Sequence, residues 1–326
     1  MSHSKPKTTR DIIQLRIEAE KAVHGLGPMN APARRMEGGW SRGVHGRRRA
    51  GPGDAFWQYR GYSQGDSPRE VDWRRSAKTG DQLFIRQKEW ESARDVWFWC
   101  DTSPSMDYCS KGGIWSKKER AIVLALAAAR LLSDGGERIG YLGSQSGERQ
   151  NCHHGRFGMD QMSENLVGQM GSETANGAAG PPLAPARGSH AHAILLSDFL
   201  MPEAQIKTAM ASFRNAGIHG QMIQVLDPAE FDFPLTGRVR VRGMEGEDEV
   251  LLPRAEARRK DYQAALHGWQ DTLRHLASEA GWSFSVHNTG HSPSTALIGL
   301  SGGHFSFEGH GPSGPQAAKQ SAGNHP

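Results

Sequence analysis

Short apolar runs alternate along this chain with longer stretches of helical periodicity. The runs Val96–Cys100 and Ile194–Leu196 contain only apolar residues and end abruptly in polar ones, as is typical of strands buried on both faces. Between them, residues 116–119 read Ser-Lys-Lys-Glu, a capping box, and Ala121–Leu132 is the apolar helix that this box opens. This alternation predicts an α/β fold with a doubly wound, mainly parallel sheet.

The same patterns predict further elements on both sides of this core. A short helix is expected from Thr9 to His24, where Gly25 and Gly27 end it. The other expected elements are strands at 138–142, 150–154, 221–226 and 282–287, a hairpin at 239–252, and helices at 159–170, 202–217 and 254–280.

Composition divides the chain into four regions. Residues 1–55 are expected to form a basic, partly disordered arm, and residues 56–94 a small β-rich region that includes a strand near 83–88. The main α/β domain is expected over residues 95–301. Residues 302–326 are rich in Gly, Pro, Ser and His, so this tail is expected to be disordered.

Asp101, Ser103 and Ser105 follow the first apolar run in a D-x-S-x-S pattern. A turn at this point presents one carboxylate and two hydroxyl groups close together. These are hard oxygen ligands of the kind that Mg²⁺ prefers, and Mg²⁺ is usually held by few protein groups together with waters. Asp and Ser are also common turn residues, so the pattern alone is more typical of a simple strand-ending turn than of a metal site.

The pattern resembles the metal-ion-dependent adhesion site of von Willebrand factor A domains. In such domains a loop Thr and an Asp at the end of a later central strand complete the site. Thr174 and Asp198 follow in that order, and groups at the carboxyl ends of strands meet at one edge of an open sheet. The resemblance implies a Mg²⁺ or Mn²⁺ site made of Asp101, Ser103, Ser105, Thr174 and Asp198. Thr102, Ser172 and Ser197 are alternatives to Thr174.

A longer motif lies upstream, between Tyr59 and Lys78, and reads Y-x-x-G-D-x-x-R-x-[IV]-[DH]-W-x-x-[ST]-A. It resembles the bacterial family catalogued as domain of unknown function 58 (DUF58), whose members join this segment to an A-type domain. Ser197–Phe199 and Asp227–Glu230 are also similar to that family, and the resemblance spans Phe56 to Leu300. The turn Gly243–Gly246 departs from it, because relatives tend to carry an acidic turn there.

The resemblance implies a binding module and not an enzyme. In A domains a carboxylate of a partner protein fills the open position on the ion, which requires no general base and no nucleophile. Members of the family resemble adaptors that present client proteins to MoxR-type AAA+ ATPases for remodelling. We therefore expect a MoxR-type ATPase as partner, together with a client that the sequence does not identify.

Two other readings stay open. A metal-dependent hydrolase or phosphatase would use Asp101 as nucleophile, although Ser103 stands where a D-x-D site would have its second Asp. Alternatively, an A-like fold would carry a vestigial ion site. Residues 299–303 match G-x-S-x-G but lack the strand before and the helix after that a nucleophile elbow requires, and no Walker loop is present.

Composition and charge indicate the protein's location and the partners of its basic arm. The 326 residues contain no apolar run near the roughly 18 that a membrane helix needs, and the first residues lead into polar sequence, as expected without a secretory signal. Three unpatterned cysteines favour reduced thiols and a cytoplasmic location. Residues 1–50 hold 11 basic against 4 acidic residues. Without an aromatic platform, a zinc finger or a helix-turn-helix pattern, this arm is expected to contact an acidic body or a partner protein and not nucleic acid.

Within the upstream motif, Asp66, Arg69 and Asp72 recur at every third position. A guanidinium supplies a planar fork that pairs well with carboxylates, and Trp73 adds a large apolar face. We expect this segment to be a structural clasp between the β-rich region and the main domain. Direct contact of Asp66 and Arg69 with the ATPase is the alternative.

Overall fold

The structure is a computed structural model, and it describes residues 11–30, 56–62, 71–79, 83–88, 93–143, 151–171, 180–185, 191–244, 248–301 and 306–307. The chain forms two compact units. The smaller unit is residues 35–93, and the larger unit combines residues 1–34 with residues 94–326.

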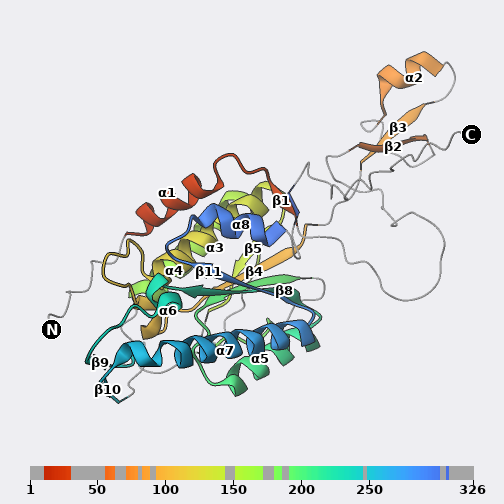
Figure 1. Ribbon diagram of the computed structural model, residues 1–326. Coiled ribbons are helices and arrows are strands. Elements are labelled where there is room, and N and C mark those ends of the chain that lie inside the picture. The colour runs from red at the N-terminus through yellow and green to blue at the C-terminus, as the bar shows by residue number, and fades with distance from the viewer. Residues whose placement is uncertain are drawn as a thin grey trace, which may run out of the picture. The chain divides into compact units, whose positions relative to one another are not determined.

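The larger unit is built on a six-stranded sheet with the order β11-β8-β7-β4-β5-β6 (Figure 1). Its strands are β4 (Asp95–Cys100), β5 (Arg138–Tyr141), β6 (His153–His154), β7 (His192–Ser197), β8 (His219–Leu226) and β11 (Ser283–Asn288). Neighbouring strands run parallel except at the β5–β6 edge, where the pairing is antiparallel. The expected mainly parallel sheet is therefore confirmed.

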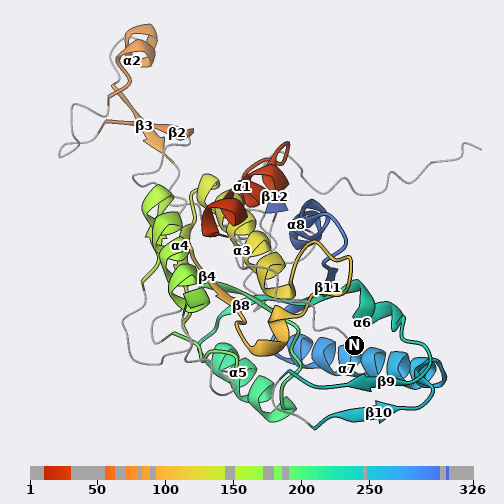
Figure 2. The ribbon, with the colours of Figure 1, turned by 90° about the vertical axis from the view of Figure 1, so that its left-hand side faces the viewer.

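Helices cover both faces of this sheet (Figures 1 and 2). One face carries α1 (Ile12–Val23), α3 (Lys117–Asp134), α4 (Gly155–Gly171) and α8 (Pro293–Ser301), and the other carries α5 (Glu203–Asn215) and α7 (Arg259–Glu279). Along β4, Phe98 packs into the first core and Trp97 and Trp99 pack into the second. Both faces of the central strand are covered, which explains its continuous apolar sequence.

The predicted capping box of α3 is present, whereas α4 and α7 begin at residues other than those predicted. The Ser116 hydroxyl accepts from the Glu119 backbone N–H at 3.1 Å, and the Glu119 carboxylate accepts from the Ser116 backbone N–H at 3.0 Å. The capping box is therefore present. Helix α4 begins at Gly155, before the expected residue 159. One turn of 3-10 helix, Ala255–Arg258, precedes α7 where a continuous α-helix was expected.

Smaller elements complete the larger unit. They are α6 (Pro228–Asp232), the expected hairpin of β9 (Val239–Val241) and β10 (Val250–Leu252), and the antiparallel pair of β1 (Met29–Asn30) and β12 (Ser306–Phe307). The pairing of β1 with β12 was not expected, because both residues of β12 lie in the predicted disordered tail. Two-residue strands are too short to show a periodicity. Among the described helices, none combines the length and apolarity that a bilayer crossing requires.

The smaller unit holds the antiparallel strands β2 (Phe56–Gly61) and β3 (Phe84–Lys88) and the helix α2 (Trp73–Thr79). The Ser76 hydroxyl donates to the Asp72 carbonyl oxygen and accepts from the Phe84 backbone N–H, so it joins α2 to β3. The Asp72 carboxylate accepts from the Arg75 N–H at 3.0 Å, as a residue before a helix often does. Asp66 and Arg69 lie outside the described residues, so the clasp stays a prediction.

Candidate metal site

Two buried carboxylates lie at the carboxyl edge of the central sheet. Asp101 follows β4 and Asp198 follows β7, and these strands are parallel neighbours in the sheet. The Asp101 backbone N–H donates to the carbonyl oxygen of Leu196 at 2.9 Å, which holds the two strand ends in register. Each carboxylate residue is only 1% exposed. The sheet topology thus brings together two residues that are far apart in the sequence.

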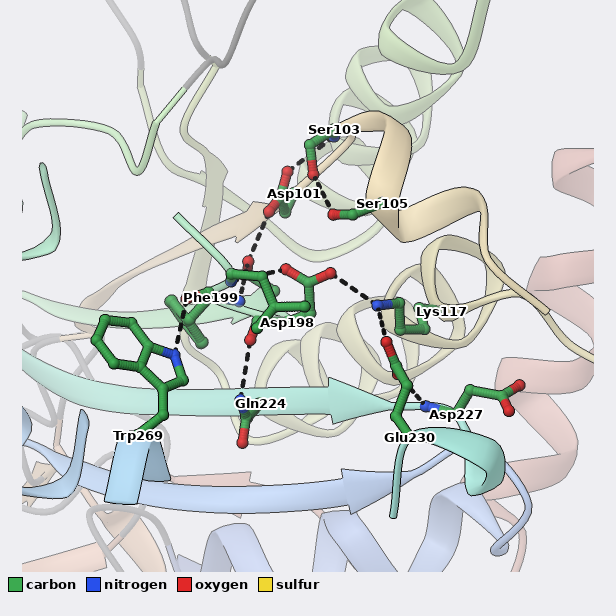
Figure 3. A network of polar contacts seen from close by, with 12 residues as sticks. Asp101, Ser103, Ser105, Lys117, Asp198, Phe199, Gln224, Asp227, Glu230 and Trp269 are labelled. Carbon is green, nitrogen blue, oxygen red and sulfur yellow. Dashed lines mark hydrogen bonds and ion pairs between the residues drawn. The ribbon is translucent and has the colours of Figure 1, made fainter. Parts of the chain in front are cut away.

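Among the described residues, only neutral groups donate hydrogen bonds to the Asp101 carboxylate. Its Oδ1 accepts from the Ser103 backbone N–H at 2.8 Å, and its Oδ2 accepts from the Ser197 hydroxyl at 2.5 Å (Figure 3). Burial raises the pKa of Asp101, and the nearby charge of Asp198 adds to this, whereas hydrogen bonds from Ser197 and Ser103 lower it. Among the described residues, no basic side chain forms an ion pair with Asp101. A buried carboxylate without a charged partner in the described part of the chain is suited to bind a cation.

The two serines of the D-x-S-x-S pattern lie beside Asp101. The turn of 3-10 helix Pro104–Asp107 follows Ser103, and its Met106 side chain is fully buried and anchors it. The hydroxyl oxygens of Ser103 and Ser105 are 3.2 Å apart. Neighbouring ligands of an octahedral Mg²⁺ ion, each at about 2.1 Å, are separated by about 3.0 Å. The spacing and the hard oxygen chemistry of these donors therefore fit a Mg²⁺ or Mn²⁺ ion.

Asp198 is engaged differently from Asp101. Its Oδ2 forms an ion pair with the Lys117 Nζ at 2.8 Å, and its Oδ1 accepts from the Leu200 backbone N–H at 3.0 Å (Figure 3). The same Lys117 Nζ lies 2.7 Å from Oε1 of Glu230. Burial lowers the pKa of Lys117, but the charges of Asp198 and Glu230 and their hydrogen bonds outweigh it, so the pKa is raised. Lys117 is therefore a buried, charged ammonium group.

The N-terminus of α6 completes this polar network. A second capping box joins Asp227 and Glu230: the Glu230 Oε2 accepts from the Asp227 backbone N–H at 2.7 Å, and the Asp227 Oδ1 accepts from the Ala229 N–H at 2.9 Å. The other carboxylate oxygen of Asp227 accepts from the Ser110 N–H at 3.0 Å. Glu230 thus uses one oxygen for the helix cap and the other for Lys117. Burial raises the pKa of Glu230, while Lys117 opposes this.

Helix α7 supports the backbone that follows β7. Phe199 has φ of 53°, a left-handed conformation that is uncommon for a residue other than glycine. Its carbonyl oxygen accepts from the Trp269 indole N–H at 3.1 Å, and its N–H donates to the Ser197 hydroxyl at 2.8 Å. The Asp198 carbonyl oxygen accepts from the Gln224 side chain at 2.9 Å. These bonds fix the turn that presents Asp198.

The structure places four of the five predicted ligands, because Thr174 lies outside the described residues, as does its alternative Ser172. Ser197, another alternative, is fully buried and bonds Asp101 directly. Sequence reasoning missed Lys117 and Glu230 as members of the site. The signal for Glu230 was available, because Asp227-Pro228-Ala229-Glu230 has the form of a capping box.

The chain is similar to a described protein family and to proteins of several bacteria. The family model described as "Protein of unknown function DUF58" matches residues 58–271. Uncharacterized proteins of Mycobacterium bovis and Mycobacterium tuberculosis are 26% identical over 253 residues, covering 71% of this chain and 77% of theirs.

Two solved structures are also similar. An aerotolerance-related membrane protein from Bacteroides fragilis is 13% identical, with a TM-score of 0.39 and coverage of 65% of this chain and 98% of that one. The conserved hypothetical protein BatB from Bacteroides thetaiotaomicron is 13% identical, with a TM-score of 0.36 and coverage of 64% and 98%.

Proposed function

The chain belongs to the DUF58 family, and from this membership and the geometry around Asp101 we propose that it is a non-enzymatic, metal-dependent protein-interaction module that serves a MoxR-type AAA+ ATPase. The observation that carries the proposal is the pair of serine hydroxyls, 3.2 Å apart, beside a buried carboxylate that, within the described ranges, accepts hydrogen bonds from neutral groups only. The proposed ion site resembles the metal-ion-dependent adhesion site of von Willebrand factor A domains.

Asp101, Ser103 and Ser105 would hold a Mg²⁺ or Mn²⁺ ion. Asp101 contributes the negative charge, and the serines contribute neutral oxygens. Asp198 would orient water or hydroxyl ligands of the ion from the neighbouring strand, and Thr174 is the proposed loop ligand. When bound, the ion supplies a coordination position for a carboxylate oxygen of a partner protein.

We infer binding and not turnover from the family resemblance, because a metal-bridged contact with a partner carboxylate requires no general base and no nucleophile. The role as an adaptor that presents clients to a MoxR-type ATPase follows from the family resemblance. The client remains to be identified by experiment.

A binding experiment with the purified full chain and a purified MoxR-type ATPase of the source organism tests the proposal. Complex formation is expected in Mg²⁺, and it should be lost in EDTA and with Asp101→Asn. Asp107→Asn is the matched control, because Asp107 lies in the same turn but is paired with Lys118 at 2.7 Å and its side chain is 55% exposed. A complex that is indifferent to EDTA and to Asp101→Asn would contradict a metal-dependent contact.

A further inference from the structure

Lys117 is a buried cation beside the proposed ion position. Its side chain is 1% exposed, and its ammonium group reaches both Asp198 and Glu230. The Tyr108 ring lies on another side, with its centroid 5.9 Å from Nζ. The ammonium group is therefore enclosed by two carboxylates and an aromatic face (Figure 3 shows the carboxylates).

Helix stability does not explain a lysine at this position. Lys117 is the first residue of α3, and a positive charge at a helix N-terminus is unfavourable because the macrodipole places partial positive charge there. Buried ion pairs also stabilise proteins little compared with apolar groups of similar volume. The position of this charge therefore calls for an explanation from the site.

The two carboxylates at the sheet edge differ in how their charges are balanced. Asp198 has an ammonium partner at 2.8 Å, and its other oxygen accepts a backbone hydrogen bond. The donors that Asp101 has among the described residues are all neutral. A cation at Asp101, Ser103 and Ser105 would meet the full charge of Asp101, whereas Lys117 offsets the charge of Asp198.

We propose that Lys117 is a positioning residue that sets the residual positive charge of the bound ion. By pairing with Asp198 it keeps this carboxylate from neutralising the ion, so that metal binding is weaker and the ion attracts a partner carboxylate more strongly. This inference rests on the proposed function, because it requires that the site binds a metal ion.

The chain offers a set of variants with opposite expected effects. In Lys117→Met the affinity for metal should rise roughly tenfold or more, because a unit positive charge near a divalent cation is removed in a poorly solvated site. Glu230→Gln removes one of the two carboxylates that pair with Lys117. The ammonium group then pairs with Asp198 alone, so metal affinity should fall. Lys118→Met is the matched control, since it removes the same charge from the next residue, whose partner is Asp107, and should change metal affinity less than about twofold.

Mn²⁺ binding to the purified full chain, followed by the electron paramagnetic resonance signal of free Mn²⁺ and by Mg²⁺ calorimetry, measures these affinities. If Lys117→Met does not fold, the double variant Lys117→Met with Glu230→Gln removes one of the two unpaired carboxylates and should still bind metal more tightly than wild type. Equal or weaker binding in the folded Lys117 variant would overturn the inference. A wild-type protein that binds no metal would instead refute the proposed function.

Discussion

The hydroxyl group of Ser197 lies 2.5 Å from Oδ2 of Asp101 and joins the ends of two neighbouring strands. Ser197 is the last residue of β7, and Asp101 directly follows β4. The hydroxyl also accepts from the Phe199 N–H at 2.8 Å, so one side chain restrains both the carboxylate and the turn after it. We regard this bond as the structural basis for the orientation of Asp101.

Replacing Ser197 with Ala should lower the free energy of unfolding by about 1–3 kcal/mol, because a buried carboxylate oxygen and a buried N–H both lose their partner. Denaturant unfolding measures the loss. Ser163→Ala is a suitable control, since Ser163 is also buried but its hydroxyl donates only to the Met159 carbonyl oxygen within α4. Equal losses in the two variants would show that the Ser197 bond has no special role.

Acid should destabilise the fold in part through His287. Burial lowers the pKa of His287 from 6.5 to about 3, with the positive charge of Arg120 acting in the same direction. The unfolded chain binds a proton near pH 6.5 and the folded chain does not, so stability falls as the pH drops from 6.5 towards 3. The slope from this group approaches about 1.4 kcal/mol per pH unit.

The free energy of unfolding should therefore fall less steeply with decreasing pH for His287→Gln than for wild type. Measurements between about pH 7 and pH 4 test this. His275→Gln serves as the control, because its side chain is 73% exposed. An unchanged pH dependence in His287→Gln would mean that His287 is not the group responsible.

Sequence patterns were sufficient for the layers of the fold and for the edge where Asp101 and Asp198 meet. Apolar strands buried on both faces have a clear pattern, and their carboxyl ends must share one edge of a parallel sheet. Lys117 could not be predicted in the same way. In the sequence it is an ordinary residue of a capping box, and only the tertiary structure brings its Nζ to Asp198.

Short elements were a second limit on what the sequence could predict. The pairing of β1 with β12 joins segments of two residues each, which carry no periodicity. Helix α2 lies in a region that was expected to hold strands and loops, and its start depends on the contact of Asp72 with the Arg75 N–H. Such short elements rest on local hydrogen bonds, which a pattern of apolar and polar positions does not reveal.

The proposed adaptor role leads to a prediction about ATP turnover. The purified chain should hydrolyse no ATP, and it should change the ATPase rate of its MoxR-type partner in the presence of Mg²⁺. A coupled phosphate-release assay of each protein alone and of the mixture provides the measurement. ATP hydrolysis by the chain alone that disappears in Asp101→Ala would show that the carboxylate is catalytic.

Metal-linked stabilisation is the most direct test of the site. A ligand that binds only the folded state stabilises it by about 2.7 kcal/mol at 100 times its dissociation constant. The melting temperature of the purified wild-type chain should therefore be higher in millimolar Mg²⁺ than in EDTA, with no difference in Asp101→Ala and the wild-type difference in Asp107→Ala. Equal melting temperatures of the wild-type chain in Mg²⁺ and in EDTA would contradict a metal site at Asp101, Ser103 and Ser105.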